Sequence, residues 1–215
     1  MSQLIEIKRK CAMCSHETEY TVILSMFTRG YSDLDMRPAI MPGFFLEYQI
    51  QRCPNCNYAN FDIEDLIPDC TTVALQSAYY REIVNDKDIP SSAKSFVLAG
   101  LLHARAKLYY ESGLCFLKAA WLFDDYEEKD FAIRARQNAV ECLIRYDNQD
   151  KNINIDMAIV DIYRRIGNFD AANNYALRLL ARGVDKKISE VLNYELLLIK
   201  LRDSDRHSMG DIPKL

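Results

Sequence analysis

Two Cys-x-x-Cys segments constrain this chain more than any other feature. Cys11 pairs with Cys14 and Cys53 with Cys56, and 38 residues separate the two pairs. A Cys-x-x-Cys turn presents two thiolates on the same side of a tight loop, and two such turns supply the four soft ligands that zinc takes in a tetrahedral site. Strand-like sequence lies beside each pair. We therefore predict one zinc ion, held by these four cysteines in a zinc-ribbon arrangement.

Other interpretations of the same pairs stay open. The four thiols can be reduced structural residues, or a pair can be a thioredoxin-type redox site, although that site needs a βαβ context that two adjacent pairs do not suggest. Iron can replace zinc in a four-thiolate site. His16 is a substitute ligand or, as we expect, a surface residue near the site. A site closed by four thiolates has no open coordination position, so we expect it to stabilise the fold and not to activate water.

Cysteine usage also bears on the compartment. The chain has seven cysteines, an odd number, and Cys70, Cys115 and Cys142 have no sequence partner, so we expect them to be small core residues. No apolar run approaches the ~18 residues of a membrane span, and the first residues lack the apolar core of a signal peptide. These features predict a cytoplasmic protein with no membrane association.

Residues 1–68 show short alternating patterns around Ile5, Tyr20 and Leu46–Gln51, which predict strands flanking the cysteine pairs. Between them, Phe27 to Gly43 lacks periodicity, which is typical of a functional or mobile loop. Its charged residues Asp33, Asp35 and Arg37 are candidates for binding a cation or a peptide. Alternatively, they are solvated turn residues or form a salt bridge that packs the loop onto the ribbon.

Residues 69–215 change to helical periodicity. We predict about seven antiparallel helices, over 71–85, 92–111, 113–124, 129–146, 155–166, 170–182 and 187–201. The predicted domains are a zinc ribbon with a long inserted loop over 1–68, a helical domain over 69–203, and a polar, frayed tail over 204–215. The fold class is therefore α+β, mainly α. We expect the ribbon to need metal in order to fold and the helical domain to hold together without it.

One segment of the helical half shows a repeat pattern. Tyr163, Gly167, Phe169 and Ala172 stand where a tetratricopeptide repeat places Tyr, Gly, an aromatic residue and Ala. In such a repeat Gly turns the chain between two helices and Ala lets their backbones approach. This pattern predicts a tetratricopeptide-like helical bundle, with Gly167 as a left-handed helix cap.

No enzyme signature is present: the sequence lacks GxGxxG, a phosphate loop, GxSxG and HExxH. The net charge is −4, without the basic excess that nucleic-acid binding usually needs. The leading hypothesis is a non-enzymatic, zinc-binding interaction or scaffold protein, whose helices bind a protein or peptide partner. The alternative is a nucleic-acid-associated or regulatory zinc ribbon.

Two stretches resemble a bacterial family catalogued as domain of unknown function 2225. The first is DLDMRPAIMPGFFLEYQIQRCPNCNYANF, with the Asp-x-Asp-x-Arg-Pro segment at 33–38 and the second cysteine pair followed by Tyr58 and Ala59. The second comprises Ala120-Trp121-Leu122 and the Tyr-Arg-Arg-x-Gly-Asn segment that begins at Tyr163. Asn57 stands where the family commonly has Gly, which should alter a turn without removing a ligand. The resemblance implies the zinc ribbon and the helical part; the family name assigns no activity.

Overall fold

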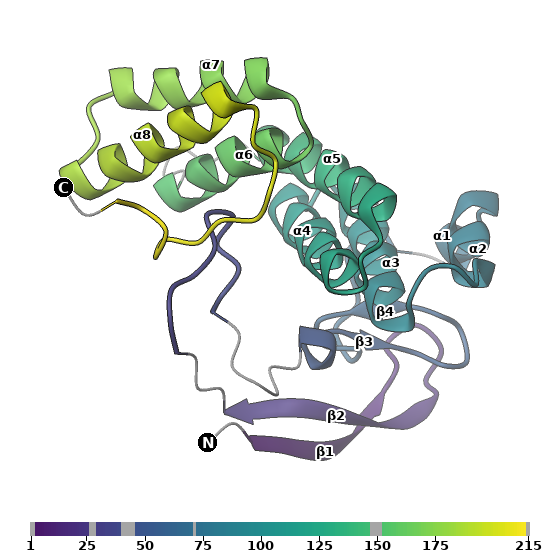
Figure 1. Ribbon diagram of the computed structural model, residues 1–215. Coiled ribbons are helices and arrows are strands. Elements are labelled where there is room, and N and C mark those ends of the chain that lie inside the picture. The colour runs from purple at the N-terminus through teal and green to yellow at the C-terminus, as the bar shows by residue number, and fades with distance from the viewer. Residues whose placement is uncertain (1–2, 26–28, 40–45, 71, 147–151, 214–215) are drawn as a thin grey trace. The chain divides into compact units, whose positions relative to one another are not determined.

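The computed structural model describes residues 3–25, 29–39, 46–70, 72–146 and 152–213. It is mainly helical with small antiparallel sheets, so the predicted α+β class is confirmed (Figure 1). The chain divides into two compact units. Unit 1 comprises Met1–Phe27 and Pro42–Tyr146, and unit 2 comprises Thr28–Met41 and Asp147–Leu215. Each unit is described by itself below.

Unit 1 begins with a β-hairpin. Strand β1 (Gln3–Lys10) pairs antiparallel with β2 (Glu17–Ser25), so that Lys10 lies opposite Glu17 and the first cysteine pair lies in the turn. A second, shorter hairpin joins β3 (Gln51–Arg52) to β4 (Ala59–Asn60), with the second cysteine pair between them. Both cysteine pairs therefore lie in hairpin turns, as the ribbon prediction requires.

The strand predicted over 46–51 is wrong for most of its length. Leu46–Gln49 forms a single 3₁₀ turn, η1, and β3 starts only at Gln51. The alternating pattern misleads because the buried apolar residues are Leu46 and Ile50, four residues apart, while Tyr48 is only half-buried. Four-residue spacing matches a helical turn and not a strand.

The helices of unit 1 follow the predicted ranges with two exceptions. The segment predicted as one helix over 92–111 ends its helix at Arg105 and begins another at Tyr109, because Lys107 at φ = 59° turns the chain, and the helix predicted over 71–85 is also divided. The structure has α1 (Thr72–Leu75), α2 (Ala78–Asn85), α3 (Ser91–Arg105), α4 (Tyr109–Asp125) and α5 (Lys129–Arg145). The first predicted helix, 71–85, is broken, because the Ser77 hydroxyl accepts a hydrogen bond from the backbone N–H of Tyr80 and caps a new helix. Thr71 itself lies outside the described residues.

The second hairpin and the helices of unit 1 share one core. The Phe61 ring contacts Phe96 of α3 with ring centroids 6.5 Å apart, and the Tyr80 hydroxyl donates to the carbonyl of Asn57 over 2.8 Å. His103 of α3 lies 3.2 Å from the side-chain oxygen of Asn60, and both side chains are buried. The predicted boundary at residue 68 therefore falls inside unit 1, because the hairpin is too small to bury these side chains alone.

Unit 2 contains α6 (Ile153–Arg165), α7 (Phe169–Ala181) and α8 (Lys186–Leu201). Small and branched side chains form its core, among them Val160, Ala172, Ala176, Leu179 and Leu192. Ala172 and Ala176 are fully buried on α7, where a larger side chain would push the neighbouring helix away. Ala172 is one of the four repeat-pattern residues identified in the sequence.

The tail of unit 2 is ordered, so the fraying predicted for 204–215 is wrong over the described residues 204–213. Buried Arg164 donates to the carbonyl oxygens of Asp203 and Asp205 and forms ion pairs with Asp161 and Glu195. These charge-assisted bonds hold the backbone that follows α8 against α6. The tail is therefore held through its backbone carbonyls, although polar side chains such as Asp205 and Arg206 are exposed.

Three helix pairs are joined by the same turn. In each, a residue at positive φ follows the first helix: Lys107 at 59°, Glu127 at 61° and Gly167 at 76°. The next backbone N–H then bonds back to the carbonyl five residues earlier, as in Asn168 to Tyr163. This is the Schellman cap, so the predicted left-handed cap at Gly167 is confirmed.

Candidate metal centre

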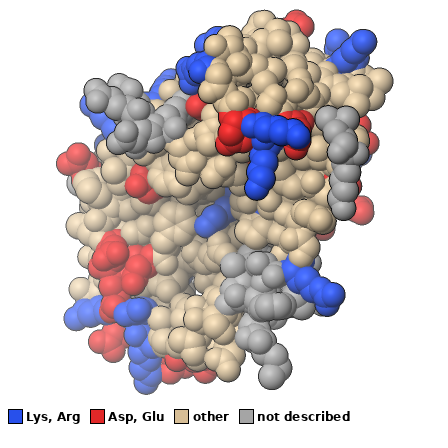
Figure 2. Space-filling view, turned by 90° about the vertical axis from the view of Figure 1, so that its left-hand side faces the viewer, with Lys and Arg blue, Asp and Glu red and all other residues tan. Residues whose placement is uncertain are grey.

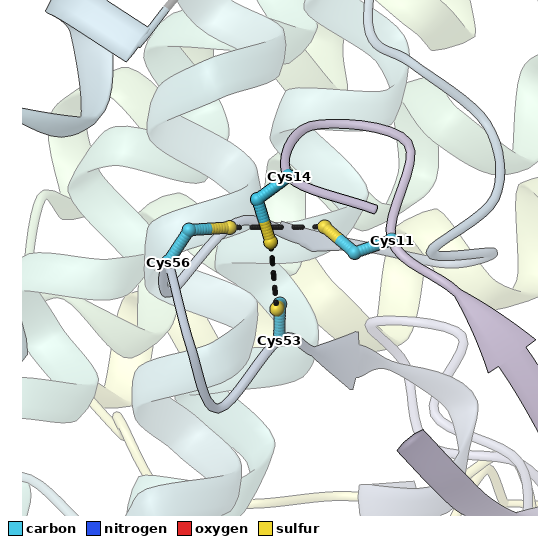
Figure 3. Close-up of side chains that lie close together, drawn as sticks. All are labelled: Cys11, Cys14, Cys53 and Cys56. Atoms are coloured by element: carbon cyan, nitrogen blue, oxygen red, sulfur yellow. Dashed lines mark hydrogen bonds between the residues drawn. The ribbon is translucent and has the colours of Figure 1, made fainter. Parts of the chain in front are cut away.

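The four cysteines of the two pairs converge from two hairpin turns (Figure 3). Cys11 and Cys14 lie in the loop between β1 and β2, and Cys53 and Cys56 lie in the loop between β3 and β4. The first cysteine of each pair is buried and the second is half-buried. Among the residues that the structure describes, this is the group of metal-ligating side chains that lies close enough to hold an ion.

The two cysteine turns have the same backbone geometry. The amide of the first cysteine donates to the carbonyl five residues on, from Cys11 to His16 and from Cys53 to Tyr58, over 2.9 and 2.8 Å. Its carbonyl accepts from the amide four residues on, which belongs to Ser15 in one turn and to Asn57 in the other. Both turns are thus hydrogen-bonded independently of any ion.

The residue four positions after each first cysteine adopts a left-handed conformation. Ser15 has φ = 60° and Asn57 has φ = 61°. Asn tolerates this conformation better than most residues, although Gly tolerates it best. Asn57 therefore maintains the turn without a Gly at this position.

The sulfur positions fit a tetrahedral ion. Cys11 Sγ lies 3.7 Å from Cys56 Sγ, and Cys14 Sγ lies 3.6 Å from Cys53 Sγ, while all four atoms lie within 4.8 Å of one another. In a regular tetrahedron with metal–sulfur bonds of about 2.3 Å, neighbouring sulfurs are about 3.8 Å apart. All seven cysteines are free thiols, so no disulfide uses these sulfurs. The donor set is compatible with zinc.

The pKa values of the cysteine thiols also favour a bound cation. Burial raises the pKa of Cys11 and that of Cys56. Burial acts on Cys14 as well, but hydrogen bonds from Asn55 and from the backbone at His16 lower the pKa of Cys14 to about 6. Burial thus disfavours the thiolate forms of Cys11 and Cys56, whereas a divalent cation deprotonates the thiols that bind it.

Neighbouring groups fix the two loops. The side-chain amide of Asn55 donates to Cys14 Sγ over 3.5 Å, which links one cysteine turn to the other. The backbone N–H of Ala12 donates to the carbonyl of Ile63, and Arg9 forms a 2.6 Å ion pair with Glu64. Asn55 was not identified in the sequence, although its position between Cys53 and Cys56 was the available signal, since hydrogen-bond partners of metal ligands orient those ligands.

The other candidates lie outside this cluster. His16 is exposed, and only its backbone takes part in the cysteine turn. Cys70, Cys115 and Cys142 are buried, as expected for core residues, and burial raises the pKa of each of these thiols. Their thiolate form is therefore disfavoured, which argues against a nucleophilic role.

The charged residues of the long loop belong to unit 2. Asp33, Asp35 and Arg37 are buried. Asp33 forms a 2.7 Å ion pair with Arg206, and Asp35 pairs with Arg165 at 3.6 Å. They are not solvated, and the partners of the two carboxylates are residues of unit 2 and not of the ribbon. Phe27 and Gly43, the predicted ends of this loop, lie outside the described residues.

Backbone hydrogen bonds also join the loop segment around Asp33 to the segment around Ser208. The amide of Leu34 donates to the carbonyl of His207, the amide of Met209 donates to the carbonyl of Ser32, and Asp33 forms an antiparallel bridge with Ser208. Leu34 is almost fully buried. The segment therefore completes the fold of unit 2, which sequence reasoning missed because its partners lie about 170 residues away.

Comparisons with known proteins locate the chain in one family. Residues 4–197 match the family described as "Uncharacterized protein conserved in bacteria (DUF2225)". No curated protein and no solved structure gives a significant match. Among the described residues, no helix is both long and apolar enough to cross a membrane.

Proposed function

The chain belongs to the family of bacterial proteins described as DUF2225, and we propose that it is a non-enzymatic interaction protein with one structural zinc ion. The observation that supports this most is the convergence of Cys11, Cys14, Cys53 and Cys56 from two hairpin turns of the same geometry. Zinc supplies positive charge there and lets all four sulfurs ionise. The chain supplies preformed turns that aim the sulfurs at one point.

The proposed zinc site is structural because the protein fills every coordination position. Four thiolates leave no position for water or substrate, and catalytic zinc sites keep one open. The second hairpin and α3 share one core, which Tyr58 and Phe61 enter from the second cysteine turn. A zinc ion that fixes this turn would therefore also stabilise the core. The seven free thiols fit a reducing compartment, so we also propose a cytoplasmic location.

The test is cobalt substitution. Co²⁺ in a tetrahedral four-thiolate site gives intense sulfur-to-metal charge-transfer and visible bands, and these report directly on the ligands. We expect those bands, unchanged when imidazole or cyanide is added. New bands on addition of either ligand would reveal an open position and contradict a purely structural site.

The helical part is proposed to bind a protein partner. Three Schellman-capped helix pairs, together with Tyr163, Gly167, Phe169 and Ala172 of the repeat pattern, support a tetratricopeptide-like arrangement. Proteins built from such helix pairs offer extended surfaces for peptides.

Nucleic-acid binding receives no support from the charged groups. In the basic run at the end of β1, Lys8 pairs with Glu19 and Arg9 pairs with Asp62 and Glu64. On the face drawn in Figure 2, basic and acidic side chains lie beside one another amid uncharged surface. A protein that neutralises phosphates needs a continuous positive surface.

A further inference from the structure

Unit 1 has a groove with an apolar floor and a charged rim, bounded by α2 on one side and by α3, α4 and α5 on the other. Its floor is formed by Phe116, Phe123 and Ala135, which are almost fully buried. Ile83 of α2 and Val97 of α3 form its walls and are half-buried. We call this feature the aromatic groove.

The aromatic groove has room for one side chain. Its volume is about 190 Å³. An apolar protein cavity of about 150 Å³ accepts a benzene molecule, so a single aromatic ring fits here. Phe131, which also lines the groove, stacks on Phe123, with ring centroids 5.2 Å apart and planes 19° from parallel. Rings that present faces and edges in this way favour another aromatic ring.

The rim of the aromatic groove is charged unevenly. On the α2 side, Glu82 is exposed and Asp86 lies at the helix end, where its side chain accepts a hydrogen bond from the backbone of Asp88. On the α5 side, the Arg134 guanidinium carbon lies 6.0 Å from the centroid of the Phe131 ring. The Phe131 ring therefore already has a cation–π partner. The Lys94 ammonium, which donates to the backbone carbonyl of Asp86, already lies beside that residue. The exposed Glu82 is thus the rim carboxylate that favours a positive partner group.

Tyr79 marks the mouth of the groove. It is 55% exposed, although it lies beside an apolar surface large enough to take a ring. A tyrosine ring that stays in water next to an unfilled apolar groove is typical of a binding surface and not of a closed core.

We propose that the aromatic groove receives an aromatic side chain of a protein partner, flanked in the partner's sequence by Lys or Arg that face Glu82. This rests on the proposed function and gives it a specific surface and partner chemistry. The ring supplies apolar burial, and the flanking cations set the orientation relative to Glu82.

The probes are three capped pentapeptides: Gly-Lys-Phe-Lys-Gly, Gly-Glu-Phe-Glu-Gly and Gly-Lys-Ala-Lys-Gly. The readout is the NMR shift of the Ile83 and Val97 methyl groups in the full chain, with the Ile188 methyl in unit 2 as an internal reference. We expect the Lys-Phe-Lys peptide to shift the groove methyls and to bind about threefold to tenfold more tightly than the Glu-Phe-Glu peptide, since an exposed charge pair contributes only modestly to affinity. The alanine peptide should leave the methyls unchanged.

Two variants test the contribution of the peptide's aromatic ring and that of the rim charge separately. Ala135→Leu fills the floor and should abolish binding of both phenylalanine peptides, whereas Glu82→Lys should reverse the preference between them. Glu6→Lys makes the same charge change on β1 and should leave the preference intact. If Ala135→Leu fails to fold, Glu82→Lys still decides the matter, because its residue is exposed.

Three results would overturn the proposal. They are groove methyls that ignore the phenylalanine peptides, equal shifts with the alanine peptide, and a charge preference that survives Glu82→Lys. Methyl shifts that grow with protein concentration alone would assign the groove to a second copy of this chain instead. Any of these would leave the cobalt spectrum untouched, so failure of the groove is distinguishable from failure of the zinc site.

Discussion

Replacing Gly167 should destabilise unit 2 through the backbone alone. Gly167 caps α6 at φ = 76°, and a Cβ built at this position meets no atom within 4 Å. The cost is therefore the left-handed conformation itself, about 1–2 kcal/mol for a residue with a side chain. We expect Gly167→Ala to cost about 1 kcal/mol and Gly167→Val to cost more, because a β-branched side chain adopts this conformation poorly.

The other two turns provide matched controls of opposite sign. Lys107 and Glu127 already hold the left-handed conformation with side chains attached, so Lys107→Gly and Glu127→Gly should each stabilise unit 1 by up to about 1 kcal/mol. Thermal unfolding followed by circular dichroism at helical wavelengths measures both directions. A loss of 1 kcal/mol should lower the midpoint of a unit of this size by about 4–8 °C. An unchanged midpoint in Gly167→Val, or a lower one in Lys107→Gly, would refute the assigned turn geometry.

Three further outcomes follow from buried polar groups and from the cysteine turns. Arg164→Met should destabilise unit 2 by about 3–5 kcal/mol in urea unfolding, because it leaves Asp161 and Glu195 buried without their cation; a loss below 1 kcal/mol would argue against the network. Burial lowers the pKa of His103 below its ordinary 6.5, so the unfolded chain binds a proton more readily than the folded chain does. The free energy of unfolding should therefore fall as the pH drops below about 6.5, and His103→Gln should reduce this pH dependence. An equal pH dependence in both proteins would show that His103 is not its source. Asn57→Gly should raise the midpoint of unit 1 slightly while metal content stays the same, and loss of metal would contradict the role assigned to that turn.

The features that the sequence predicted best are those set by residues that lie close together in the chain. A Cys-x-x-Cys turn is local, and only its convergence with a second turn depends on the fold, so the four-cysteine cluster followed from spacing alone. Helices α5 to α8 followed from apolar periodicity, and Gly167 from the conformational freedom of glycine, whereas the turn at Lys107 between α3 and α4 has no glycine to mark it. At 46–50 the same kind of pattern failed, because a five-residue stretch is too short to distinguish alternation from the Leu46–Ile50 helical spacing.

Long-range pairing could not be predicted from one sequence. Asp33 and Asp35 look like solvated turn residues until Arg206 and Arg165 are known to face them. The polar tail looks frayed until Arg164 is found bonded to its carbonyls. The boundary at residue 68 followed the change from strand to helix, whereas the compact units follow buried contacts such as Phe61 with Phe96. A cysteine substitution should therefore loosen α3 as well as the hairpins.

The most direct test of the central claim is metal content measured by elemental mass spectrometry, on protein purified without chelator and under reducing conditions. The account predicts about one zinc per chain, no zinc in Cys53→Ser or Cys14→Ser, and full zinc in Cys70→Ser, which removes a thiol outside the cluster. Metal-free wild-type protein, iron in place of zinc, or full zinc in Cys53→Ser would contradict it.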